Sequence, residues 1–249
     1  MSLDQQIDQL INPLARGLSD IIFYQINIFG QGFPLIVLWL VSAAVFFTCY
    51  LGFINIRGFS KAISIVSGKN GKSSGPGEIS HFQALSTAIS GTVGVGNIGG
   101  VAVAISIGGP GAAFWLFMAG FLGMSTKFVE CTLGVKYRRH NPDGSVSGGP
   151  MYYLERYLLD RGFPQLGKLL GGFYALALVI GCFGIGNMFQ SNQAYVQVLG
   201  ITGGENSFFA DKGWLFGLLL GGAVAAVIIG GIRSIASVAS KIVPFMAVL

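Results

Sequence analysis

Charged residues are scarce in this sequence: Asp, Glu, Lys and Arg make up 10% of it, whereas 52% of the residues are hydrophobic. Between Ile79 and Thr126 none of the four occurs, and that run is long enough to cross a bilayer about twice at roughly 20 residues per span. Such a composition excludes an ordinary soluble domain and predicts a multi-span membrane protein. In that setting the net charge of +5 does not indicate a nucleic-acid partner.

Residues that carry catalytic or metal chemistry are also sparse. Cys49, Cys131 and Cys182 lie in or at the ends of apolar segments without metal-ligand spacing, so we expect free buried thiols. His81 and His140 lie in predicted loops, and the sequence offers no paired nucleophile and base. We therefore predict that the protein is not an enzyme, has no cofactor and holds no metal beyond a transported cation.

The N-terminus lacks the basic start and short apolar core of a secretory signal peptide. Residues 1–31 instead place apolar side chains near helical spacing among a few charges, which predicts an amphipathic helix on the membrane surface. Residues 32–249 form the predicted transmembrane domain, whose first full span covers residues 33–53.

Glycine, in contrast, is abundant where a membrane helix normally has little of it. Five of the ten residues in Gly91–Gly100 are glycine, and each costs roughly 1 kcal/mol relative to alanine in a helix interior. We predict a discontinuous transmembrane helix, with half-helices of ~13 Å over 82–90 and ~16 Å over 98–108. Its break falls near the midplane, where non-helical backbone is tolerated only if it is buried in protein or lines a cavity.

Two other interpretations of these glycines are open. Glycines in membrane helices often serve only close helix packing. The segment Gly94-x-Gly96-x-x-Gly99 also matches the dinucleotide-binding pattern, which should follow a strand and have an acidic residue about 20 positions later. The next acidic residue is Glu130, and the flanking segments are typical of a membrane helix, so a ligand-binding break is favoured.

The ends of two half-helices suit a pair of opposite charges. The first half-helix directs free carbonyls and the negative end of its dipole at the gap, which attracts a cation. The second directs free N–H groups and its positive end there, which attracts a carboxylate. One gap can thus hold the coupling ion and an anionic or zwitterionic substrate.

Residues 82–139 resemble the alanine/glycine:cation symporter family of prokaryotic amino-acid transporters. The specific segments are Gly91–Gly100 and Gly108-Gly-Pro-Gly-Ala-Ala-Phe-Trp-Leu-Phe117, and residues 145–153 and 184–192 are similar to further family segments. The resemblance covers nearly the whole chain. It implies a leucine-transporter-type fold of two inverted five-helix repeats, of which this chain holds an extra first helix and the first repeat.

The resemblance also implies a set of ligands at the break. The carbonyls of Ser90, Thr92 and Val93 and the side chain of Asn97 are expected to bind sodium, a hard cation that prefers oxygen ligands. Substrate binding is expected at Thr92 and at two backbone amides of the unwound segment, those of Val95 and Gly96.

Two further polar features belong to the predicted site. In the related fold a glutamate at the place of Glu130 supports the unwound helices, although the residues alone also allow an interfacial carboxylate neutralised by Lys127. Asn187 and Gln190 share a face of the 171–199 helix within a dense group of amides. Such amides either hold helices together or line a polar path, and we assign these two to the substrate.

The distribution of Lys and Arg predicts on which side of the membrane each loop lies. Later spans are predicted over 112–133, 171–199 and 214–232, and a last span begins near Lys241 and is truncated at Leu249. Alternating sides then put 13 of the 15 Lys and Arg residues on one face, with only Arg16 and Lys212 on the other. This asymmetry predicts a protein of the cytoplasmic (inner) membrane with its N-terminus outside.

The sequence thus predicts sodium-coupled symport of a small neutral amino acid, by resemblance alanine or glycine. An ion channel or a structural membrane protein with glycine-mediated packing is the alternative. Because alternating access needs a second, inverted repeat, we expect the missing half of the same protein to be a required partner and this chain alone to be inactive.

Overall fold

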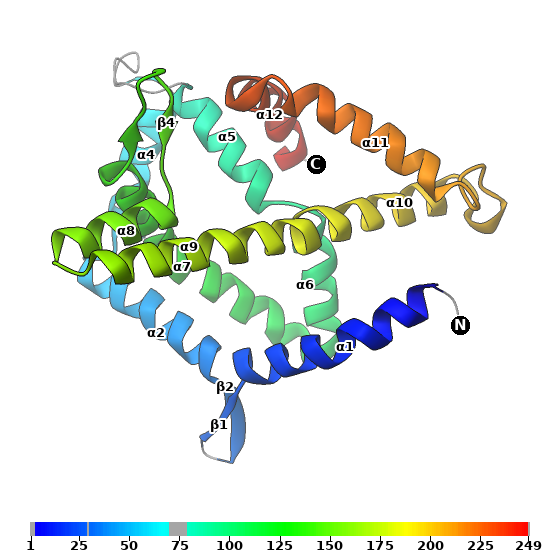
Figure 1. Ribbon diagram of the computed structural model, residues 1–249, viewed down its shortest axis with the longest axis horizontal. Helices are drawn as coiled ribbons and strands as arrows, with labels where there is room; N and C mark the ends of the chain where they lie inside the picture. The colour runs from blue at the N-terminus through cyan, green and yellow to red at the C-terminus, as the bar shows by residue number, and fades with distance from the viewer. Residues whose placement is uncertain (1–2, 29, 70–78, 249) are drawn as a thin grey trace. The chain divides into compact units, whose positions relative to one another are not determined.

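The computed structural model describes residues 3–28, 30–69 and 79–248, which are almost entirely helical (Figure 1). Helices account for 78% of the chain, as the all-α prediction requires. The described strands form two short antiparallel hairpins, β1 (Gln25–Ile28) with β2 (Gln31–Pro34) and β3 (Arg139–His140) with β4 (Val146–Ser147). The chain divides into two compact units, residues 1–57 with 115–129 and residues 58–114 with 130–249.

The first unit begins with α1 (Leu3–Ile22), which agrees with the predicted N-terminal helix; its place at the membrane surface stays a prediction. The β1–β2 hairpin follows, and then the apolar α2 (Leu35–Tyr50) and the short α3 (Ile54–Arg57). The predicted 33–53 span is too long, because Pro34 ends β2 and Gly52 turns the chain with φ +60°. At 16 residues, α2 measures ~24 Å.

A buried pair of hydroxyl groups joins α2 to the middle of α7 (Pro110–Lys136) within this unit. The Thr48 hydroxyl lies 2.7 Å from the Ala44 carbonyl and 3.0 Å from the Ser125 hydroxyl. Both side chains are almost fully buried. The hydroxyls satisfy one another, so their burial carries little of the penalty that an unpaired polar group would incur.

The second unit contains the predicted broken helix, as α5 (His81–Thr92) and α6 (Val95–Gly108). It is preceded by α4 (Phe59–Val66). The Ser80 side chain caps α5 through a capping box with Gln83. After α6, Gly109 turns the chain into α7 with φ +68°, a conformation that glycine adopts without steric cost.

The rest of this unit is built on one long helical segment. After β4 come α8 (Pro150–Asp160), α9 (Pro164–Gly181), the π-helix η1 (Cys182–Met188) and α10 (Phe189–Ile201). The last three form one continuous helix of 38 residues. The 3-10 turn η2 (Gly204–Asn206) then leads to α11 (Gly213–Ile228) and α12 (Gly231–Val248).

The last helix corrects the predicted topology. We expected a span to end near Arg233 and another to begin near Lys241, but α12 runs through both residues. It is amphipathic: Ala236, Ala239 and Val243 are buried at helical spacing, while Arg233 and Lys241 are exposed. This buried face packs on α5, where Ser86 is also buried.

Two helices of the described chain are long and apolar enough to cross a membrane, Pro110–Lys136 and Pro164–Ile201. A third span exists if α11 and α12, bent by 112°, count as one. Judged by the length and composition of single helices, the described chain has fewer spans than predicted. The reason is that α2, α5 and α6 are each shorter than the roughly 20 residues that a crossing needs. The cysteines are free but exposed, so the prediction of buried thiols is wrong.

Candidate substrate and ion site at the broken helix

The break is two residues wide. Val93 (φ −98°, ψ 103°) and Gly94 (φ −142°, ψ −173°) are extended, and α5 and α6 leave them in different directions (Figure 1). We expected an unwound segment over 91–97, which is too wide. Gly91 and Thr92 still belong to α5, and the Asn97 N–H donates to the Gly94 carbonyl at 2.9 Å, which closes the first turn of α6.

Both helix ends direct polar backbone groups at this break. The last hydrogen bond of α5 runs from the Val93 N–H to the Ile89 carbonyl at 2.7 Å. The carbonyls of Ser90, Thr92 and Val93 therefore lie beyond the end of the hydrogen-bond ladder, where the helix dipole is negative. On the other side, Val95 and Gly96 are the first two residues of α6, where the dipole is positive.

The hydroxyl groups of α5 near the break bond to their own helix. Ser90 Oγ donates to the Thr87 carbonyl at 2.8 Å, and Thr92 Oγ1 donates to the Ala88 carbonyl at 2.7 Å. Each hydroxyl oxygen keeps lone pairs after donating its proton. Both residues are exposed, so their oxygens can still accept a hydrogen bond or ligate a cation.

Gln190 comes to the break from a distant part of the sequence. A Cβ placed on Gly94 would lie 3.5 Å from Gln190 Oε1 and 3.8 Å from its Nε2. The half-buried Gln190 belongs to α10, which packs on α6. The structure thus joins two sequence features that were predicted separately, the glycine-rich break and the amide cluster.

For the other predicted site residues, the structure gives their position in a helix and, where the side chain is described, its exposure. Asn187 is exposed and lies in the π-helix, where its carbonyl accepts a hydrogen bond from the Ser191 hydroxyl at 2.7 Å. Asn97 is exposed in the first turn of α6. Glu130 is half-buried in α7. The side chain of Val95 lies outside the described part of the chain.

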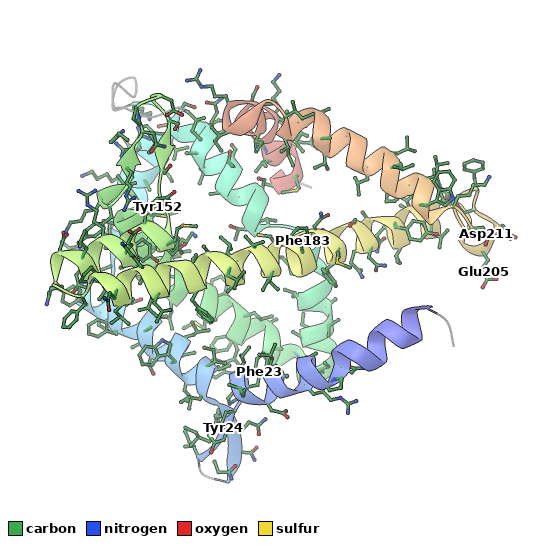
Figure 2. The ribbon with its side chains drawn as sticks, in the orientation of Figure 1. Phe23, Tyr24, Tyr152, Phe183, Glu205 and Asp211 are labelled. Carbon is green, nitrogen blue, oxygen red and sulfur yellow. The ribbon has the colours of Figure 1, made fainter. Side chains whose placement is uncertain are left out.

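The π-helix was missed by sequence reasoning. Its wide turns show in the hydrogen bond from the Phe189 N–H to the Gly184 carbonyl, five residues back. Exposed Phe183 marks this segment in Figure 2, seven residues before Gln190, the residue that reaches Gly94. Single π turns inside α-helices are frequent at functional sites, and the pair Gly184 and Gly186 beside an amide is the only sequence signal that pointed to one.

A discontinuous helix with polar groups at the break is the geometry of a membrane transporter site. The family model of the sodium:alanine symporter family matches residues 17–249, and the chain belongs to this family. The family and its relatives are transporters, which confirms that the chain is not an enzyme. The apolar helices and the family together indicate a multi-pass membrane protein.

Three relatives illustrate the similarity. The chain is 42% identical to the sodium/alanine symporter AgcS of Methanococcus maripaludis, over 90% of this chain and 47% of that protein. It is 40% identical to the putative sodium/proton-dependent alanine carrier protein YrbD of Bacillus subtilis, over 81% and 38%. It is 34% identical to the probable sodium/glutamine symporter GlnT of the same organism, over 86% and 42%.

The chain therefore spans less than half the length of each of these relatives. No solved structure matches it.

Proposed function

We propose that this chain forms about half of a sodium-coupled symporter for a small neutral amino acid, alanine or glycine, in the cytoplasmic membrane. The observation that carries the proposal is the break between α5 and α6 with Gln190 beside Gly94. Family membership supports cation-coupled amino-acid transport, and alanine appears in the names of two relatives.

In this proposal the α5 side of the break binds the cation. The carbonyls of Ser90, Thr92 and Val93 lie at the negative end of α5, and Asn97 adds an amide oxygen from α6. These neutral oxygen atoms can coordinate a hard monovalent cation. The substrate carboxylate supplies the negative charge that the site itself lacks.

The α6 side binds the substrate. Its carboxylate lies at the N–H groups of Val95 and Gly96 and at the Thr92 hydroxyl, while Gln190 and Asn187 provide polar contacts from the neighbouring helix. Gln190 already lies at the break. Asn187 lies one turn earlier, in the π-helix.

We further propose that Glu130 supports the unwound region, that the N-terminus faces outside, and that a second, inverted repeat of the same protein completes the fold. The inverted repeat would supply the second broken helix and the surface against which this half moves.

Transport assays test the proposal directly. The complete protein, expressed in a strain without its own alanine uptake, should take up labelled alanine in a saturable way that depends on a sodium gradient. The 249-residue chain alone should not exceed the empty-vector control. Uptake by the chain alone would show that no second repeat is required, and unsaturable conductance would favour the channel.

A further inference from the structure

A cluster of positive charge lies between α7 and the apolar part of α9. Residues 136–168 contain six basic and three acidic residues, which gives this segment a net charge of +3. We call the six the basic cluster: Lys136, Arg138, Arg139, Arg156, Arg161 and Lys168. The transport proposal makes no use of them.

Folding brings Arg139, one member of the basic cluster, into contact with α8. The guanidinium of Arg139 in β3 lies 3.3 Å from the Glu155 carboxylate of α8 and 5.5 Å from the ring centre of Tyr152, which Figure 2 labels. The side chains of Arg139 and Glu155 are 42% and 31% exposed. Ion pairs exposed to this extent contribute little to stability. Arg139 therefore stays available to another anion.

Two glycines hold α8 antiparallel against the start of α9. A Cβ on Gly167 would lie 2.8 Å from the Glu155 carbonyl oxygen, and a Cβ on Gly171 would lie 2.9 Å from that of Met151. These close approaches require glycine at both positions. Lys168 is exposed and directly follows Gly167, so its backbone lies close to α8.

The length of the following helix places the cluster at the membrane surface. The continuous helix Pro164–Ile201 has 38 residues, which corresponds to roughly 55 Å, whereas the hydrocarbon core is ~30 Å thick. A large part of this helix must therefore extend beyond the hydrocarbon. Its charged end, with Lys168 and the attached α8, extends into the headgroup layer.

The exposed side chains of α8 and of the turn that follows it suit that layer. Arg156 and Arg161 are exposed, and Arg161 lies 5.2 Å from the ring centre of Tyr157. Tyr157, Leu159 and Phe163 are 44%, 54% and 60% exposed. Apolar and aromatic groups beside cations are typical of helices at the membrane interface, and a nucleic-acid surface would not need them.

We propose that the basic cluster binds the phosphate groups of anionic phospholipids, with Arg156 and Arg161 as its main ligands. Arginine forks match phosphate oxygens in a bidentate way, and basic residues next to a membrane span attract anionic lipid. The exposed apolar side chains of α8 insert among the acyl chains nearest the headgroups.

Native mass spectrometry of the purified complete protein, titrated with phosphatidylglycerol or phosphatidylcholine, tests this. We expect tighter binding of phosphatidylglycerol, weakened about fivefold by R156Q and more by R156Q/R161Q, since each basic residue near anionic lipid contributes about that factor. K212Q removes a charge from the loop that follows the other end of the 38-residue helix and should leave binding unchanged. Soluble glycerol phosphate should not compete.

Equal retention of the two lipids by the unaltered protein would overturn the proposal, as would unchanged binding in R156Q/R161Q. Competition by glycerol phosphate would show a site for free phosphate instead. The variant R156K/R161K keeps the charge and should retain the preference for phosphatidylglycerol. If it binds phosphatidylglycerol as weakly as R156Q/R161Q does, charge has no role in the binding.

Discussion

Replacing Gly94 with larger residues distinguishes a need for space from a need for glycine backbone. The φ of −142° at Gly94 is extended backbone that any residue adopts. A Cβ there would meet Gln190 Oε1 at 3.5 Å, an ordinary van der Waals distance. We therefore expect G94A to fold and transport with an alanine KM within about threefold of the unaltered protein.

A leucine at the same position must displace the Gln190 amide, because its additional carbons extend past the Cβ towards Oε1. A hydrogen bond to a charged group contributes about 1.5–3 kcal/mol, so losing the Gln190 contact to a zwitterionic substrate should raise KM by roughly 10- to 100-fold. The assay is sodium-driven uptake of labelled alanine at several concentrations. Expression and thermal unfolding of each variant serve as controls.

The double variant G94L/Q190A provides the sharpest test. If both changes act on the same amide, their effects on KM should not add. Additive effects would mean that Gly94 and Gln190 act separately. A G94A variant as impaired as G94L would refute the argument from space.

Three further predictions follow from the structure. N97A should abolish sodium-dependent uptake while leaving expression intact, and an unchanged sodium dependence would remove Asn97 from the cation site. G171A should lower the thermal unfolding temperature, because its Cβ would meet the Met151 carbonyl at 2.9 Å, whereas G172A meets nothing within 4 Å and should not; equal effects would contradict the packing of α8 on α9. Hydrogen bonds from the Ser145 side chain and backbone lower the pKa of Asp143, so the ordering of this loop should be present at neutral pH and be lost as the pH falls below about 4. The measurement is the protection of the Ser145 amide against hydrogen exchange, relative to the intrinsic exchange rate at each pH; protection that does not fall with the pH would contradict the prediction.

The broken helix could be predicted because its cause is local. Glycine density in a run without charge indicates a break, and α5 and α6 end within a few residues of the predicted bounds. Its width could not be predicted, because helix ends depend on individual bonds such as that from the Asn97 N–H to the Gly94 carbonyl.

Other features depend on tertiary contacts that no single segment reveals. The approach of Gln190 to Gly94 joins residues far apart in sequence. The α8 helix lies between the predicted 112–133 and 171–199 spans, where no helix was predicted, although its contacts with Gly167 and Gly171 fix it on α9. For α12, the charges Arg233 and Lys241 suggested span ends, whereas the buried spacing of Ala236, Ala239 and Val243 shows one amphipathic helix.

We propose that the break and Gln190 together form the substrate site. The most direct measurement is the alanine KM of sodium-driven uptake by Q190A in the complete transporter, normalised to the amount of protein in the membrane. We expect a KM raised roughly 10-fold or more, with expression close to that of the unaltered protein. An unchanged KM, or a loss of uptake fully explained by lower expression, would contradict it and leave Gln190 as a contact between helices.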